Sequence, residues 1–222
     1  MGRGQVLAKS NISAVNLWFL KSGTDLISAL VEADVEGEHL EEWEILAFCI
    51  LLLVAGNETT TNLTSNMLDI LVEGSDLWRR LREDRSRVEV AIEETLRFES
   101  PVQMLTRFVT RDIEIDGRKI FQGQPVAASY GAGNRDPAVF PDPDTFALDR
   151  DQSKHLGFGA GIHYCLGAPL ARVEAQIMLN GMLDRFSSIA RNDQAPERQR
   201  ATNLLLGFRK VLDIRPGFRP VG

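Results

Sequence analysis

The sequence predicts a mainly α fold with small β-sheets, an α+β class. Several long stretches carry apolar residues at helical spacing, and between them short segments alternate apolar and polar residues. These two periodicities distinguish helices from strands. The chain has 222 residues, of which 44% are hydrophobic and 25% are charged. This size and composition suit a soluble globular protein with one core. We expect a single domain over residues 1–222, with 1–23 as a poorly defined lead-in.

Two helices are expected in the first third of the chain. Residues 24–34 place apolar side chains on one helical face, and Gly37 interrupts this pattern. A longer helix begins near Glu41, with acidic residues in its first turn, where the helix dipole favours them. It continues through the apolar segment 45–56 to Leu71. Its all-round hydrophobicity predicts a buried central helix, since 45–56 is too short to span a bilayer.

Three more helices are expected further along the chain. Residues 76–83 form a short charged stretch, typical of a surface helix. A helix over 88–98 ends before Pro101, because the residue preceding a proline is pushed out of the helical conformation. The last helix covers 168–186 and has Pro169 in its first turn, where a missing N–H costs little.

The remaining segments are expected to be strands and irregular loops. Alternating residues over 102–126, with turns marked by Gly117 and Gly123, predict short strands. Residues 131–150 are rich in Pro, Asn and Asp and predict a long irregular segment. A loop of this length is usually functional or held by specific contacts. The tail over 200–216 is typical of a strand pair.

Charge and cysteine content exclude several classes of partner. The net charge is -6, and an acidic surface is unfavourable for binding nucleic acids or anionic membranes. The two cysteines, Cys49 and Cys165, cannot form a disulfide framework and favour a reducing compartment. No secretory apolar stretch follows the first residues. We therefore expect a cytoplasmic protein with no nucleic-acid and no membrane partner.

The strongest chemical signal is Cys165, in the run Phe158-Gly-Ala-Gly-Ile-His-Tyr-Cys-Leu-Gly167 just before the last predicted helix. Glycines let the backbone approach a flat ligand closely. Amides at a helix N-terminus stabilise an anionic sulfur, the form that binds metals. A zinc or iron–sulfur site would lack ligands here, whereas a haem iron needs one thiolate. The alternative is a buried structural cysteine in a glycine turn.

This run resembles the haem-binding loop of the cytochrome P450 family, F-x-x-G-x-[HR]-x-C-x-G, at every fixed position. Three further segments resemble family motifs in the family's order. Residues 55–60 resemble the oxygen-activation segment of its long central helix, and 94–97 resemble its E-x-x-R helix. Residues 140–146 with Arg150 resemble the meander before the haem loop. The resemblance covers about 24–216 and is closest to soluble bacterial members.

The resemblance implies a haem b cofactor with Cys165 as the thiolate ligand of its iron. It implies that Glu58 and Thr59 relay protons to bound dioxygen. The alternative for this pair is a helix bent at a glycine, with polar neighbours facing solvent. A larger set of residues is implied to contact the cofactor: Ala55, Gly56, Arg107, His155, Phe158, Gly159, His163, Gly167 and Ala171.

Within this set, Arg107, His155 and His163 match positions that bind the haem propionates. Charge-assisted hydrogen bonds from arginine to carboxylate are the expected chemistry. Phe158 is implied to pack on the haem near the sulfur. Lone histidines are more often structural, which is the alternative for His155 and His163.

The resemblance also implies a structural network and part of a pocket. Glu94 and Arg97, with Arg150 as their partner, would form a buried network with the meander rather than an exposed ion pair. Val102 and Leu105 match a strand that borders the substrate pocket, although apolar residues there are equally suited to a core.

The implied activity is that of a haem-thiolate monooxygenase, which inserts one atom of O2 into a small organic substrate. Electrons would come from a separate redox partner of the ferredoxin and reductase type, docking near Lys154 and Arg172. The part matching the family's N-terminal half is missing, so we expect a truncated cytochrome P450 fold. The alternative is a truncated non-catalytic haem-binding relative or a gene fragment. A helical interaction domain would leave the glycine-rich loop unexplained.

Overall fold

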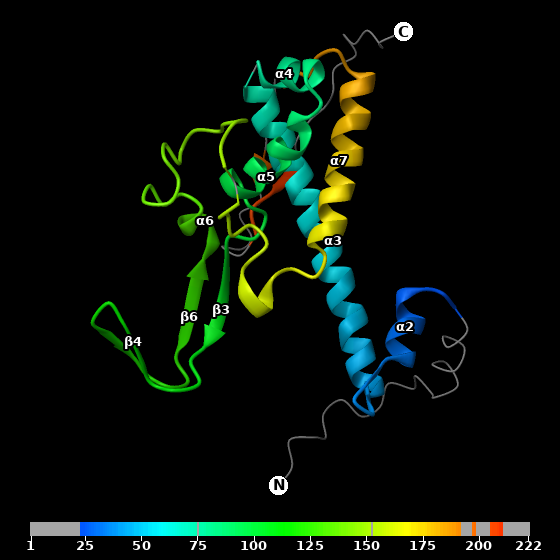
Figure 1. Cartoon of the computed structure of the whole chain (residues 1–222), viewed down its shortest axis with the longest axis vertical. Coiled ribbons are helices and arrows are strands. Elements are labelled where there is room, and N and C mark those ends of the chain that lie inside the picture. The colour runs from blue at the N-terminus through cyan, green and yellow to red at the C-terminus, as the bar shows by residue number, and fades with distance from the viewer. Residues whose placement is uncertain (1–22, 75, 152, 192–196, 199–204, 211–222) are drawn as a thin grey trace. The chain divides into compact units, whose positions relative to one another are not determined.

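The computed structural model describes residues 23–74, 76–151, 153–191, 197–198 and 205–210, shown in colour in Figure 1. Residue contacts divide the chain into two compact units, Met1–Gly56 and Asn57–Gly222. The described elements are helices joined by small two-stranded antiparallel sheets, as expected for the α+β class. Most of the predicted lead-in lies outside the described residues.

The first unit contains a short helix, a hairpin and the start of the longest helix. Helix α2 (Leu26–Glu32) begins at Asp25, whose carboxylate accepts a hydrogen bond from the Ser28 amide at 3.0 Å. Strands β1 (Asp34–Val35) and β2 (Glu38–His39) pair across a turn at Glu36 and Gly37, both with positive φ. The sequence pattern indicated only a helix break at Gly37, and this hairpin was not expected.

Helix α3 (Glu42–Glu73) runs through Gly56 without interruption. The expectation that its first half is buried is wrong. Ile45 is buried, but the exposed fractions of five apolar residues lie between 41% and 75%: Leu46, Ile50, Leu51, Leu53 and Val54. The reason is that the rest of the described first unit is one short helix and a hairpin of two two-residue strands. These elements cannot cover a helix that is apolar on all sides.

By length and composition, α3 is the one helix among the described residues that could cross a membrane. Its most apolar 18-residue window has a mean hydropathy of 1.4. This is weak support for a membrane span, because the central helix of a soluble protein passes the same test.

The second unit is built around three further helices, α4 (Leu77–Glu83), α5 (Arg87–Phe98) and α7 (Ala168–Arg185). α7 contacts both α4 and α5 (Figure 1). The core joins apolar residues of all three helices to the second half of α3. Its buried members are Leu63, Met67, Leu71, Trp78, Leu81, Val88, Ala91, Ile92, Leu96, Leu148, Ala175, Leu179 and Leu183. Burial of apolar surface, which stabilises the fold by about 25 cal/mol per Å², drives this packing.

Helix α4 is less peripheral than its charged sequence predicts. Trp78 and Leu81 are buried in the core, and the Trp78 indole donates to the Phe186 carbonyl at 3.2 Å. Arg79 lies on the exposed side of α4, where it pairs with Asp76 and Glu83. The helix is therefore amphipathic, and only its outer face is the expected surface.

The strands described in the second unit form three small antiparallel sheets. β3 (Met104–Phe108) pairs with β6 (Pro125–Ser129), and β4 (Ile113–Ile115) pairs with β5 (Arg118–Ile120). Asp116 and Gly117 connect β4 to β5 with positive φ, as a tight hairpin turn requires. The predicted tail pair is described only in part: β7 (Glu197–Arg198) pairs with β8 (Phe208–Lys210), and the other residues of 200–216 apart from 205–207 lie outside the described range.

The long segment expected to be irregular begins with a single helical turn, α6 (Tyr130–Gly133). Ser129 caps this turn, its hydroxyl accepting from the Ala132 amide at 3.4 Å. Turns and bends then continue to the Cys165 loop. Specific side-chain contacts hold this segment, and they belong to the site described next.

Candidate functional site

Cys165 lies in a tight loop that α7 closes. The loop contains the 3-10 turn η1 (Gly161–His163), and the Cys165 amide donates to the Phe158 carbonyl at 2.9 Å. Gly159 and Gly161 have φ values of 74° and 63°, a left-handed conformation that favours glycine. These bonds and turns bring Phe158 and Cys165 together across the loop.

The start of α7 shapes the environment of the cysteine. Gly167 is the N-cap residue, and the Ala171 amide donates to its carbonyl at 2.9 Å. Ala171 is half-buried in the first turn, and Pro169 also lies there, as expected. A helix N-terminus carries unpaired N–H groups and the positive end of the dipole. These N–H groups lie next to Cys165, which comes two residues before the N-cap residue Gly167.

The donor set around Cys165 fits a haem iron. Its thiol is free and exposed. In the part of the chain that the structure describes, no group of three or more His, Cys, Asp or Glu residues could hold a bare metal ion. A porphyrin supplies four nitrogen ligands and needs only one thiolate from the protein. Ile162, 98% exposed, and Leu166 add apolar surface beside the thiol.

The predicted propionate partners occupy different environments. Arg107 is exposed on β3, with Nη1 donating to the neighbouring Thr106 carbonyl at 3.1 Å, and His163 is exposed in η1. His155 is 7% exposed, and both its ring nitrogens are engaged. Nε2 bonds Glu93 at 2.8 Å, and Nδ1 accepts from the Gly157 amide at 3.0 Å. Arg107 and His163 thus present N–H groups at the surface, whereas His155 uses its N–H internally.

Glu93 joins His155 to α7. Its carboxylate accepts two hydrogen bonds from Arg172, from Nε at 2.6 Å and from Nη2 at 2.9 Å. Burial would raise the pKa of Glu93, but the bonds from His155 and Arg172 outweigh it and lower the pKa to about 2. The same bond to Glu93 raises the pKa of Arg172. Glu93 did not emerge from the sequence because its partners lie far away in the chain.

Glu94 and Arg97, next on α5, form a second and fully buried pair. Two parallel hydrogen bonds of 2.8 Å join the guanidinium to the carboxylate. Arg97 also donates to three carbonyls of the long irregular segment, those of Asn134, Pro143 and Thr145. This arginine therefore holds the segment against α5.

Arg150 completes this network from the other side. Its Nε donates to Glu94 at 3.2 Å, and its remaining nitrogens donate to the carbonyls of Pro141, Asp142 and Thr145. The three residues that the sequence analysis grouped into a structural network thus lie together in the structure.

Asn134 is a linking residue that the sequence analysis missed. It is fully buried, and its Oδ1 accepts from the Leu156 amide at 2.6 Å while its Nδ2 donates to the Leu96 carbonyl at 3.4 Å. Its own carbonyl accepts from Arg97. Asn134 thereby ties the irregular segment to α5 and to the loop leading to Cys165. One asparagine in a polar segment offers no sequence signal for this.

The other predicted site residues lie on α3 and beside β3. Glu58 and Thr59 are half-buried in the second unit, whereas Ala55 and Gly56 are exposed in the first. Val102 and Leu105 are half-buried. Val102 pairs with Leu205 in an isolated bridge, which brings a segment near the C-terminus against the predicted pocket wall.

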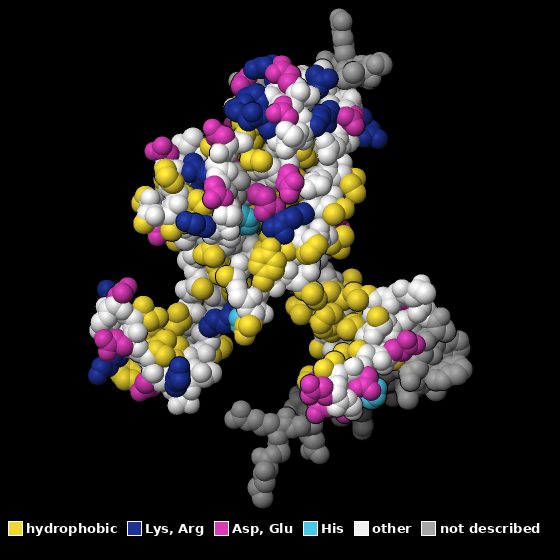
Figure 2. Space-filling view, viewed as in Figure 1, with side chains coloured by type: hydrophobic (Ala, Val, Ile, Leu, Met, Phe, Trp, Pro, Cys, Tyr) yellow, Lys and Arg dark blue, Asp and Glu magenta, His cyan; other side chains and the backbone are white. Residues whose placement is uncertain are grey.

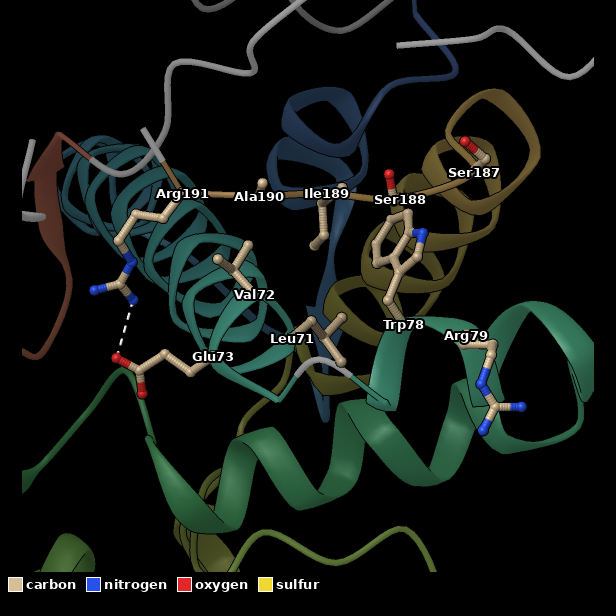
Figure 3. A pocket seen from close by; sticks show the side chains of 10 residues that line it. All are labelled: Leu71, Val72, Glu73, Trp78, Arg79, Ser187, Ser188, Ile189, Ala190 and Arg191. Atoms are coloured by element: carbon tan, nitrogen blue, oxygen red, sulfur yellow. Dashed lines mark hydrogen bonds and ion pairs between the residues drawn. The ribbon is translucent and has the colours of Figure 1, made fainter. Parts of the chain in front are cut away.

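A separate pocket of about 470 Å³ lies between the C-terminal end of α3, α4 and the segment after α7 (Figure 3). Its apolar wall includes Leu71, Trp78 and Ile189. Arg191 and Glu73 neutralise each other across 3.0 Å at one side. Cys165 is not among its lining residues, so this pocket is not the site that the cysteine loop forms.

An exposed cysteine at the start of a helix suits ligation of a haem iron through one thiolate. The family model described as Cytochrome P450 matches residues 7–212. The chain belongs to the cytochrome P450 family, whose members bind haem iron through a cysteine thiolate.

The relatives are bacterial and longer than this chain. Cytochrome P450 109 of Bacillus spizizenii is 47% identical over 165 residues, which are 74% of this chain and 41% of that protein. Cytochrome P450 107B1 of Saccharopolyspora erythraea is 44% identical over 88% of this chain and 48% of its own length. The monooxygenase PikC of Streptomyces venezuelae is 40% identical over 88% and 47%. The chain thus spans about half the length of the curated relatives it matches.

Solved structures confirm the predicted fold. Substrate-free CYP109E1 from Bacillus megaterium superposes with a TM-score of 0.87 and 40% identity, over 92% of this chain and 54% of that one. The same enzyme in complex with testosterone gives a TM-score of 0.83 over 89% and 56%. The fold is that of cytochrome P450 over about half of its length.

Proposed function

We propose that this chain is the haem-binding part of a bacterial haem-thiolate monooxygenase acting on a small organic substrate. The observation that carries the proposal is the exposed Cys165 thiol at the N-terminus of α7. Both flanks of the loop around it are bonded to Glu93, through His155 and Arg172. Such a loop presents one thiolate in a fixed direction, which is what ligation of a single haem iron requires.

The cofactor in this proposal is haem b, bound through the Cys165 sulfur. When bound, the haem supplies dioxygen activation, and the thiolate favours O–O cleavage. Arg107 and His163 are exposed and bind the propionates through charge-assisted hydrogen bonds. Phe158 and Gly159, in the same loop as Cys165, would also contact the porphyrin. Further contacts would come from Gly167 and Ala171 at the start of α7.

Glu58 and Thr59 deliver protons in this proposal. Both are half-buried on α3, where a carboxyl and a hydroxyl could hold and pass a proton on the side of the cofactor. Val102 and Leu105 border the substrate.

Electrons reach the haem from a separate ferredoxin-type partner. Lys154 is exposed and suits docking of an acidic protein, whereas Arg172 is largely committed to Glu93. We place the protein in the cytoplasm, without membrane or nucleic-acid partners, in keeping with its net charge of -6.

The test is a carbon-monoxide difference spectrum of the reduced chain after haem loading. A strongly red-shifted Soret band is expected, and Cys165→Ala should abolish it. Cys49→Ala is the matched control and should leave the band intact, because Cys49 lies in the first half of α3 and outside the loop. No haem uptake by the unmodified chain would contradict the proposal. A red-shifted band without substrate turnover under electron supply would favour the non-catalytic haem-binding relative.

A further inference from the structure

The carboxylate of Glu93 is bonded to both flanks of the Cys165 loop. On the N-terminal flank it accepts from His155 Nε2 at 2.8 Å. On the C-terminal flank it accepts two bonds from the Arg172 guanidinium on α7, at 2.6 and 2.9 Å. One side chain of α5 therefore holds the two ends of the loop that carries Cys165.

Each partner extends the restraint further into the loop. The second nitrogen of His155 accepts from the Gly157 amide, so the ring fixes the chain where the loop begins. Gly157 itself packs tightly on α5, because a Cβ added there would stand 2.8 Å from the Leu96 carbonyl oxygen. The N-terminal flank thus has one defined position.

Arg172 restrains the two aromatic residues next to the thiol. Its guanidinium lies over the Phe158 ring at 4.6 Å, and its Nη1 donates to the Tyr164 hydroxyl at 3.1 Å. Phe158 accepts the backbone hydrogen bond of Cys165, and Tyr164 directly precedes Cys165. The position of Arg172 therefore bears on the position of the sulfur.

The electrostatics favour a lasting restraint. The Glu93 side chain is only 18% exposed and remains ionised at neutral pH, because its pKa is about 2. Charge-assisted, bidentate bonds from arginine are among the strongest hydrogen bonds in proteins. Exposed ion pairs, by contrast, contribute little.

We propose that Glu93 is a positioning residue that sets the Cys165 loop, through His155 and Arg172, in the geometry that accepts haem. This inference rests on the proposed function and deepens it. It gives the two adjacent acids of α5 separate tasks: Glu94 holds the irregular segment, and Glu93 holds the thiolate loop. It also gives His155 a task within the protein instead of on a propionate.

The first test uses the haem-free chain, so that it does not depend on haem uptake. Glu93→Gln preserves the shape of the side chain and removes its charge. Amide hydrogen exchange in a peptide covering 156–167 should become at least about tenfold faster, since hydrogen bonds to charged groups are the costliest to lose. Glu89→Gln is the matched control, an exposed glutamate one turn earlier on the same helix, and should leave exchange unchanged.

The second test measures haem in the loaded chain. Glu93→Gln should release haem to an acceptor globin roughly ten times faster, and it should lower the red-shifted carbon-monoxide band per bound haem. His155→Gln keeps an N–H for Glu93 and should retain more of the band than His155→Ala. A general loss of stability would lower haem content without changing the band per haem.

The outcomes separate the two proposals. Faster exchange in 156–167, with the helices α3 and α5 still protected, supports the positioning role. Unchanged exchange in both Glu93→Gln and Arg172→Gln overturns it, whether or not haem binds. If Glu93→Gln does not fold, Arg172→Gln decides alone, because Arg172 is partly exposed and frees only one flank. If amide exchange in 156–167 becomes faster in Glu93→Gln but the unmodified chain takes up no haem, the proposed function fails and the positioning role of Glu93 stands.

Discussion

Replacing Arg97 by alanine should remove much of the stability of the second unit. Arg97 and Glu94 are both fully buried, and the guanidinium makes five hydrogen bonds, two to Glu94 and three to backbone carbonyls. Without it, the Glu94 carboxylate stays buried and keeps its bonds from Arg150 and the Ala147 amide. Removing one partner of a buried ion pair leaves the other charge uncompensated and costs about 3–5 kcal/mol.

This loss is large compared with the total free energy of unfolding. Domains of this kind have free energies of unfolding of about 5–15 kcal/mol, so the loss would take a third or more of the total. Arg97→Lys should lie in between, because lysine retains the charge but cannot make the planar, bidentate contact. Urea unfolding followed by helical circular dichroism measures both variants.

Arg79→Ala is the control for this experiment. Arg79 has two ion pairs on α4, but its side chain is 60% exposed, so the unfolding midpoint should not change. The reasoning would be refuted if Arg97→Ala lost less than about 1 kcal/mol, the size expected of an exposed pair. The burial of Glu94 would then not carry the energetic weight assigned to it.

Two further predictions concern the same region. The pKa of Glu93 falls from 4.5 to about 2 on folding, so the folded form holds fewer protons. The ionised Glu93 carboxylate therefore stabilises the fold by about 3 kcal/mol above pH 4.5, and this stabilisation is lost as the pH falls toward 2. The difference in unfolding free energy between the unmodified chain and Glu93→Gln should shrink over that range. A difference that stays constant with pH would contradict this prediction. Gly157→Ala should lower the free energy of unfolding by about 1–3 kcal/mol, and with it the melting temperature, because the alanine Cβ would crowd the Leu96 carbonyl. At Gly56 an alanine Cβ has open space on α3, so Gly56→Ala should instead raise the free energy of unfolding by up to about 1 kcal/mol. Similar effects at both glycines would refute the packing argument.

The local elements followed from the sequence because their causes are local. Pro101 ends α5 and Pro169 begins α7 through constraints on neighbouring residues, and α5 and α7 were expected within one or two residues of their bounds. The loop with Cys165 was equally predictable, since its glycines and its place before a helix are adjacent in the chain.

The burial of α3 could not be predicted in the same way. Its hydrophobic first half indicates a covered helix, but cover depends on which other segments pack there. The described first unit has too few of them, and Leu53 and Val54 remain exposed. Composition specifies what a helix could bury and not what it does bury.

The sequence specified the long helices, the strands over 102–126, the glycine-rich loop around Cys165 and the Glu94–Arg97 pair, whose members lie one helical turn apart. Folding decided which distant groups share a carboxylate. His155 and Arg172 meet at Glu93, and Asn134 meets Leu156, because α5 packs on α7 and the irregular segment folds over α5. Such contacts depend on packing between elements, and periodicity and spacing along one chain carry no information about them.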